Sequence, residues 1–221
     1  MRELWITFRL LVLLTGFIGA GALVALLPAL LPDVMQRLAI GVGSATVLAG
    51  AIAGWSLAEE RQRGRAAWLV GRSVSRGTLL GSWFVAMSLI CLTGATVAAL
   101  LGWLTASGVS LRLDPGSFAA AIVAVAATIL AAIAFGLLVG ALMRPRLAAI
   151  ITSVLLAGLG ALAWLLRDIT GLIPGAALVR LAELREGATM EVAALVAAGV
   201  SLLVAAMLLA AARLVIERTD L

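Results

Sequence analysis

The 221-residue sequence contains no histidine, no lysine and no tyrosine, and it contains a single cysteine. Without histidine, and with Cys91 inside a long apolar run, the chain lacks the residues for a zinc site or a Cys–His nucleophile. Without lysine, it cannot form the Gly-x-x-x-x-Gly-Lys-Ser/Thr loop that holds the phosphates of ATP. A membrane enzyme is therefore disfavoured, and any ATP that powers this protein must bind to another chain.

Charged residues are also scarce. They make up 12% of the chain, and hydrophobic residues make up 64%, whereas soluble proteins average about 25% and about 45–50%. A charge at the middle of a bilayer costs about 2.5–3.5 kcal/mol and is usually kept for a function. The long apolar runs carry no charge in their middles, which disfavours a transporter driven by protons or sodium ions.

Six long apolar runs account for most of the sequence, and each is long enough for a helix that crosses the roughly 30 Å hydrocarbon core. They cover residues 10–31, 38–58, 78–105, 118–143, 147–166 and 192–212. The runs are too long for the strands of a membrane barrel, so the backbone must satisfy its hydrogen bonds within helices. The sequence predicts an all-α polytopic membrane protein with six transmembrane helices, forming a single transmembrane domain over residues 1–221.

All sixteen basic residues are arginines, and the net charge is +5. With a cytoplasmic N-terminus, eleven arginines fall on the inner side and five on the outer side, which satisfies the positive-inside rule. The inner set is Arg2, Arg9, Arg61, Arg63, Arg65, Arg72, Arg76, Arg144, Arg146, Arg213 and Arg218, and the outer set is Arg37, Arg112, Arg167, Arg180 and Arg185. We therefore expect both termini in the cytoplasm, and we read the basic charge as a sign of topology and lipid contact rather than of nucleic-acid binding.

Small residues recur at the spacing that brings helices together in lipid. Gly50 and Gly54 are four residues apart, and so are Gly136 and Gly140. Such pairs let helix backbones approach closely, so each pair is a candidate helix contact.

The longest inner connection follows the second run and carries a cluster of arginines. Its apolar positions Ala67, Trp68, Val70 and Gly71 follow helical spacing, which indicates a short amphipathic helix at the membrane surface. The alternative is an ordinary basic loop whose arginines reach the lipid headgroups.

This segment resembles the signature loop of type-2 ABC exporter permeases, the membrane subunits of many bacterial ABC exporters. In that family the second span ends in Glu, and a Gly-Thr pair, Leu-Leu, Pro-Val-Ser-Arg and Leu-Leu-x-Gly-Lys follow. The matching residues here are Glu60, Gly64, Leu69, Val74, Ser75, Arg76, Leu79, Leu80 and Gly81. The chain departs from the family at Arg65, Ser73 and Ser82, where the family has Thr, Pro and Lys. The six-span layout and the chain length also resemble that family.

The resemblance implies a multi-pass permease in the bacterial cytoplasmic membrane, without a nucleotide site or an enzymatic activity of its own. Two permease chains, identical or paralogous, would assemble with two copies of an ABC ATP-binding subunit, which would carry ATP and Mg. The implied coupling interface with that subunit comprises Glu60, Gly64, Arg65, Trp68, Leu69, Arg72 and Arg76. Short re-entrant helices near the outer leaflet would lie between the fifth and sixth spans, around Ile169, Pro174 and Leu178.

The cargo is constrained mainly by exclusion. Aromatic residues are 5% of the chain, which argues against a sugar-stacking channel, and a pathway of small apolar residues with a few hydroxyls suits an amphipathic or lipid-like substrate. Lipids, hydrophobic peptides and drugs all remain open. The alternative function is the substrate-capture membrane subunit of a vitamin importer, which predicts a pocket near the outer face but not the long basic loop.

Overall fold

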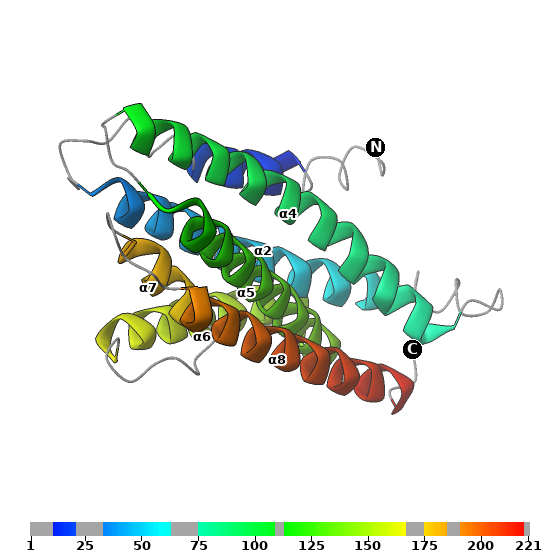
Figure 1. Cartoon of the computed structure of the whole chain (residues 1–221). Helices are drawn as coiled ribbons and strands as arrows, with labels where there is room; N and C mark the ends of the chain where they lie inside the picture. The colour runs from blue at the N-terminus through cyan, green and yellow to red at the C-terminus, as the bar shows by residue number, and fades with distance from the viewer. Residues whose placement is uncertain are drawn as a thin grey trace.

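The structure is a computed structural model that describes residues 11–20, 33–62, 75–108, 113–166, 175–184 and 191–218. These residues form seven helices and no strand (Figure 1). The helices are Leu11–Ala20, α2 (Val34–Gln62), α4 (Arg76–Gly108), α5 (Pro115–Leu142), α6 (Pro145–Leu165), α7 (Ala176–Ala182) and α8 (Glu191–Arg218). The predicted all-α fold is confirmed for this part of the chain.

Five helices, α2, α4, α5, α6 and α8, are long and apolar enough to cross a membrane, which indicates a membrane-embedded protein. Each corresponds to one of the last five predicted runs. Of the first predicted run, residues 10–31, the structure describes the ten-residue helix Leu11–Ala20. The sixth span therefore stays a prediction.

Most of the long helices begin a few residues before the apolar runs because polar side chains cap their first turns. The Asp33 carboxylate accepts a hydrogen bond from the Met35 N–H at 2.9 Å at the start of α2. At the start of α5, the Asp114 carboxylate accepts one from the Ser117 N–H at 2.7 Å, and this bond lowers the pKa of Asp114. The Ser75 hydroxyl has the same role before α4. Such caps satisfy N–H groups that have no partner within the helix.

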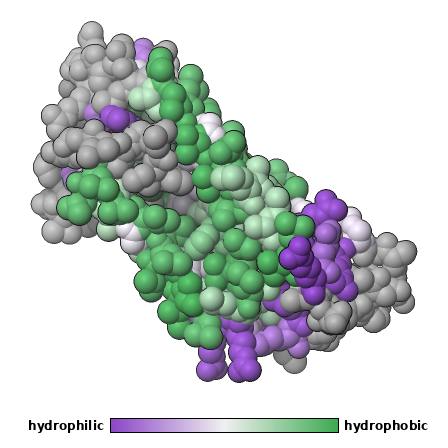
Figure 2. Space-filling view, turned by 90° about the horizontal axis from the view of Figure 1, so that it is seen from below, coloured by the Kyte–Doolittle hydropathy of each residue, from purple (hydrophilic) through white to green (hydrophobic). Residues whose placement is uncertain are grey.

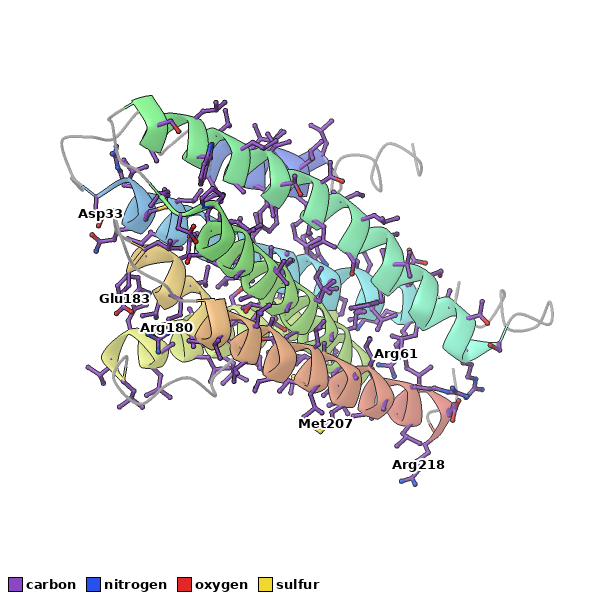
Figure 3. The ribbon with its side chains drawn as sticks, in the orientation of Figure 1. Asp33, Arg61, Arg180, Glu183, Met207 and Arg218 are labelled. Carbon is purple, nitrogen blue, oxygen red and sulfur yellow. The ribbon has the colours of Figure 1, made fainter. Side chains whose placement is uncertain are left out.

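The five long helices lie along the long axis of the bundle, and each is antiparallel to the next long helix in the sequence (Figure 1). The connection between α5 and α6 is short, since only Met143 and Arg144 separate them. The ends of α2 provide names for the two ends of the bundle. The Asp33 end holds the starts of α2, α5 and α8, together with α7; the Arg61 end holds the starts of α4 and α6 and the ends of α2, α5 and α8. Figure 3 labels Asp33, Arg180 and Glu183 at one end and Arg61 and Arg218 at the other.

α5 is the central helix, since it packs against α2, α4, α6, α7 and α8. Its contact with α2 brings the two glycine pairs together, which confirms both as helix contacts. A Cβ atom added to Gly54 would lie 2.8 Å from the Gly136 carbonyl oxygen, and one added to Gly136 or Gly140 would overlap the backbone of Gly50 or Gly54. Only glycine permits this approach of the two backbones.

The outward faces of α6 and α8 are apolar. Val154 on α6 is 64% exposed and Leu203 on α8 is 62% exposed. Figure 2 shows this side of the molecule as a broad hydrophobic surface, with hydrophilic residues gathered toward one end. A water-soluble monomer rarely exposes so large an apolar surface, whereas a bilayer accommodates it.

The glycine contact gives a direct stability prediction. We expect Gly136→Ala to lower the free energy of unfolding by about 3 kcal/mol or more, because the new methyl group would overlap the Gly50 carbonyl and force α2 and α5 apart. The measurement is the apparent melting temperature of the detergent-purified protein. Gly199→Ala is the matched control, since a Cβ at Gly199 meets open space. Equal melting temperatures for the two variants would contradict the contact.

Candidate functional site

The structure describes two of the seven residues of the predicted coupling interface, and both lie at the Arg61 end. Glu60 is half-buried in the last turn of α2, and Arg76 is the first residue of α4. The other five, Gly64, Arg65, Trp68, Leu69 and Arg72, lie outside the described residues. The interface as a whole stays a prediction, but the helices on both sides of it are defined.

Arg61 fastens the end of α2 to the end of α5. Its guanidinium group donates hydrogen bonds to the carbonyl oxygens of Ala141 and of Gly140, the latter at 3.3 Å. The last carbonyls of a helix lack partners within the helix and carry partial negative charge. A guanidinium group therefore supplies both the missing hydrogen-bond donors and a favourable positive charge. The glycine contact allows this bond, because it holds α2 against α5 within reach of one side chain.

Arg76 forms the corresponding connection on the other side of the loop. Its guanidinium group donates to the carbonyl oxygens of Ile216 at 3.1 Å and Glu217 at 3.2 Å, at the end of α8. The Glu217 carboxylate in turn pairs with Arg213 at 2.7 Å. Arg76 was predicted for the interface with the ATP-binding subunit; here it also caps α8. Residues 63–74 thus connect two helix ends, one fastened to α5 and the other to α8.

Basic residues gather at the Arg61 end. Six of the eight arginines in the described segments lie there, and two lie at the Asp33 end. The six are Arg61, Arg76, Arg144, Arg146, Arg213 and Arg218, and the two are Arg37 and Arg180. Acidic residues are more evenly divided, with Glu59, Glu60 and Glu217 at the Arg61 end and Asp33, Asp114, Glu183 and Glu191 at the other. The Arg61 end of the described structure is therefore the positive one.

A second feature is an apolar cavity of about 400 Å³ that extends from the middle of the bundle toward the Asp33 end. Its floor comes from α2 and α5, its walls from α6 and α8, and its roof from α7. Leu178, one of the predicted re-entrant residues, extends from α7 into the lining. α7 is a short helix in the predicted region, but its re-entrant character stays a prediction, and Ile169 and Pro174 lie outside the described residues.

The sequence did not predict the arginine caps, and only the alternative function, a vitamin-capture subunit, predicted a pocket. Arg61 follows the apolar run 38–58 by three residues, so hydropathy alone places it in the loop rather than in the helix. A basic residue in the last turn of a helix is the signal that could have identified a cap. Within the described segments, no group of three or more His, Cys, Asp or Glu residues could hold a metal ion.

Comparison with known proteins assigns the chain to a family without giving a function. The model of the family described as "Protein of unknown function (DUF2705)" matches residues 34–221, so the chain belongs to the DUF2705 family. No curated protein and no solved structure matches the chain. The match begins at the first residue of α2, so it includes the loop, the arginine caps and the cavity.

Arg61→Met tests the cap on α5. Methionine preserves the apolar stem but leaves the Gly140 and Ala141 carbonyls without their donor, and we expect a loss of about 1–2 kcal/mol in the free energy of unfolding. Thermal melting in detergent measures the effect. Arg146→Met, at an exposed arginine of the same end, should change stability by less than about 0.5 kcal/mol. A similar loss in both variants would show that Arg61 contributes only surface charge.

Proposed function

We propose that this chain is the membrane-spanning permease subunit of an ATP-driven exporter of the type-2 ABC class, in the cytoplasmic membrane of a bacterium. Two such chains would assemble with two ATP-binding subunits, and the ATP would be hydrolysed by those subunits. The observation that carries the proposal is the segment of residues 60–81, which bears the family-like sequence and includes the connection between two helices fastened by Arg61 and Arg76.

The arginine caps suit a role in coupling. Closure of the ATP-binding subunits would be passed to whichever segment is docked on them. A force on the loop would reach α2 and α4 first, and the two arginines would pass it to α5 and α8. Both α5 and α8 border the cavity. The loop is therefore mechanically connected to the elements that shape the cavity.

The proposed orientation places the Arg61 end in the cytoplasm and α7 near the outer leaflet, consistent with the excess of arginine at the Arg61 end. Single cysteines in a Cys91→Ala background test it. Gly116→Cys lies next to the Asp114 cap and Arg146→Cys at the start of α6, and both positions are exposed. On intact cells, a membrane-impermeant thiol reagent should label Gly116→Cys and spare Arg146→Cys until the cells are lysed. The reverse pattern would overturn the topology.

The cavity is the observation that favours the alternative function, a vitamin-capture subunit, because that function predicts a pocket toward the outer face. Its lining argues against a vitamin. Ser44, Thr46 and Thr128 donate their hydroxyl protons to carbonyls of their own helices. These hydroxyls therefore have no proton left to donate to the polar ring of a vitamin. Equilibrium binding of radiolabelled thiamine, riboflavin and biotin to the purified chain separates the two functions, and we expect none to bind.

The coupling prediction concerns Trp68, which combines a large apolar side chain with neighbouring arginines. Such residues often dominate an interface, and truncation of one costs about 2 kcal/mol or more, or roughly 30-fold in affinity. The tagged protein is purified from its own host into nanodiscs, together with any subunit bound to it. We expect Trp68→Ala to lose most of the Mg-ATP hydrolysis seen with the wild type. It should also retain little of the separate, co-purified chain that 8-azido-ATP labels.

Two comparisons make this experiment decisive. Arg180→Ala removes an arginine at the opposite end of the bundle and should keep both the labelled chain and the ATP turnover. The wild-type chain produced without any partner should hydrolyse no ATP. Turnover by that isolated chain, or full turnover in Trp68→Ala at normal abundance, would contradict the proposed function.

A further inference from the structure

The cavity has a chemistry of its own, apart from any coupling to ATP. Its described lining is composed of Ala, Gly, Leu, Val, Ile, Phe and Trp side chains and three hydroxyls. Those hydroxyls are bonded to helix carbonyls, with Ser44 to Ile40 at 2.9 Å and Thr46 to Val42 at 2.7 Å. A buried water needs two to four polar partners, and these hydroxyls, whose protons are already donated, can only accept. The cavity therefore suits a hydrocarbon ligand.

The shape of the cavity directs it toward the lipid. α6 and α8 form its two walls but do not pack against each other, while α7 packs against both of them at the Asp33 end. Because the two walls do not pack against each other, we take the space between them as the way into the cavity, on the side of α6 and α8 where the exposed residues are apolar. Leu159, on the α6 wall, is 41% exposed at this opening. A group that enters here comes from the hydrocarbon layer and not from water.

The size of the cavity matches one chain of a lipid. An apolar cavity of about 150 Å³ accepts a benzene molecule, so a cavity of about 400 Å³ holds roughly 16 carbon atoms in proportion. In a bilayer the hydrophobic effect does not favour entry, because the chain leaves one apolar medium for another. The gain comes from dispersion contacts, which the lining of an empty cavity forgoes.

We infer that the cavity is a binding site for one acyl chain of a membrane lipid, which enters between α6 and α8. The chain lies along α5, and its polar end stays at the Asp33 end, where the Trp164 indole joins the lining. Tryptophan side chains favour the depth of the lipid headgroups. This inference concerns the chain alone and does not depend on the proposed transport.

Two glycines of α6 provide a matched pair of variants. Gly160 lines the cavity, and a Cβ built on it meets no atom within 4 Å. Gly160→Phe therefore adds a bulky side chain at the cavity lining, where its first carbon meets no neighbour. Gly158 has the same freedom but does not line the cavity. Gly158→Phe therefore adds the same side chain on another face of the same helix and serves as the control.

The experiment uses the purified chain, without any ATP-binding subunit, in nanodiscs that contain a phosphatidylethanolamine with a diazirine near the end of its palmitoyl chain. After photolysis, peptide mass spectrometry locates the adducts. Thr46 and Thr128 are 5% and 7% exposed, so surrounding lipid does not reach them. We expect adducts at these floor residues and at Ala132 in the wild type and in Gly158→Phe, and about tenfold fewer in Gly160→Phe, whose ring occupies the space of about six carbons.

Adducts confined to outward residues such as Val154 and Leu203, or floor adducts unchanged in Gly160→Phe, would overturn the acyl-chain site. Because no nucleotide or partner is present, failure here leaves the proposed transport function untouched, and loss of ATP turnover in Trp68→Ala leaves this site untouched.

Discussion

The structure depends on one contact, the approach of the α2 backbone to the α5 backbone at Gly50, Gly54, Gly136 and Gly140. In lipid, burial of apolar side chains does not drive helices together, so association depends on close packing. Glycine allows the closest packing because it removes the side chain from the interface. α5 packs against every other labelled helix, so its position against α2 determines where the rest of the bundle lies.

The same contact explains why the two ends of the bundle differ. Toward the Arg61 end, α2 and α5 lie so close that Arg61 reaches the carbonyls of α5, and Thr152 of α6 packs onto Gly50 and Gly54. Beyond this point, toward the Asp33 end, α6 and α8 follow separate sides of α5 and leave the cavity between them. α7 closes the space that the long helices do not fill. The contact between α2 and α5 thus explains both the close packing with arginine caps at the Arg61 end and the apolar cavity toward the Asp33 end.

The fold class followed from the apolar runs, because length and hydrophobicity alone distinguish a membrane helix. The helix starts extend past those runs because Asp33 and Asp114 are caps, a role that hydropathy does not record. Spacing identified Gly50 with Gly54, and Gly136 with Gly140, as two faces suited to helix contacts. It could not show that these two faces contact each other, because a repeat along one helix does not identify the partner helix. The cavity was beyond prediction because five elements contribute to it, and along each helix its residues read like any lipid-facing apolar residue. Arg76 shows the limit of a motif, since the side chain that the resemblance places in a partner interface also caps α8.

The chemistry of the described segments restricts where energy could enter. Their charged residues lie near the two ends of the bundle, and the cavity has hydroxyls already bonded to their own helices. For the proposed exporter, the middles of these helices therefore offer no carboxylate to an ion gradient, and the work would come from ATP-binding subunits outside the bilayer. The loop at the Arg61 end offers such a route, through α5 and α8 to the cavity walls. If that route operates, a movement that brings α8 toward α6 narrows the space that an acyl chain would occupy. Lipid in the cavity would then resist the movement of α8 toward α6. A lipid-like cargo and the driving force would therefore act on the same pair of helices.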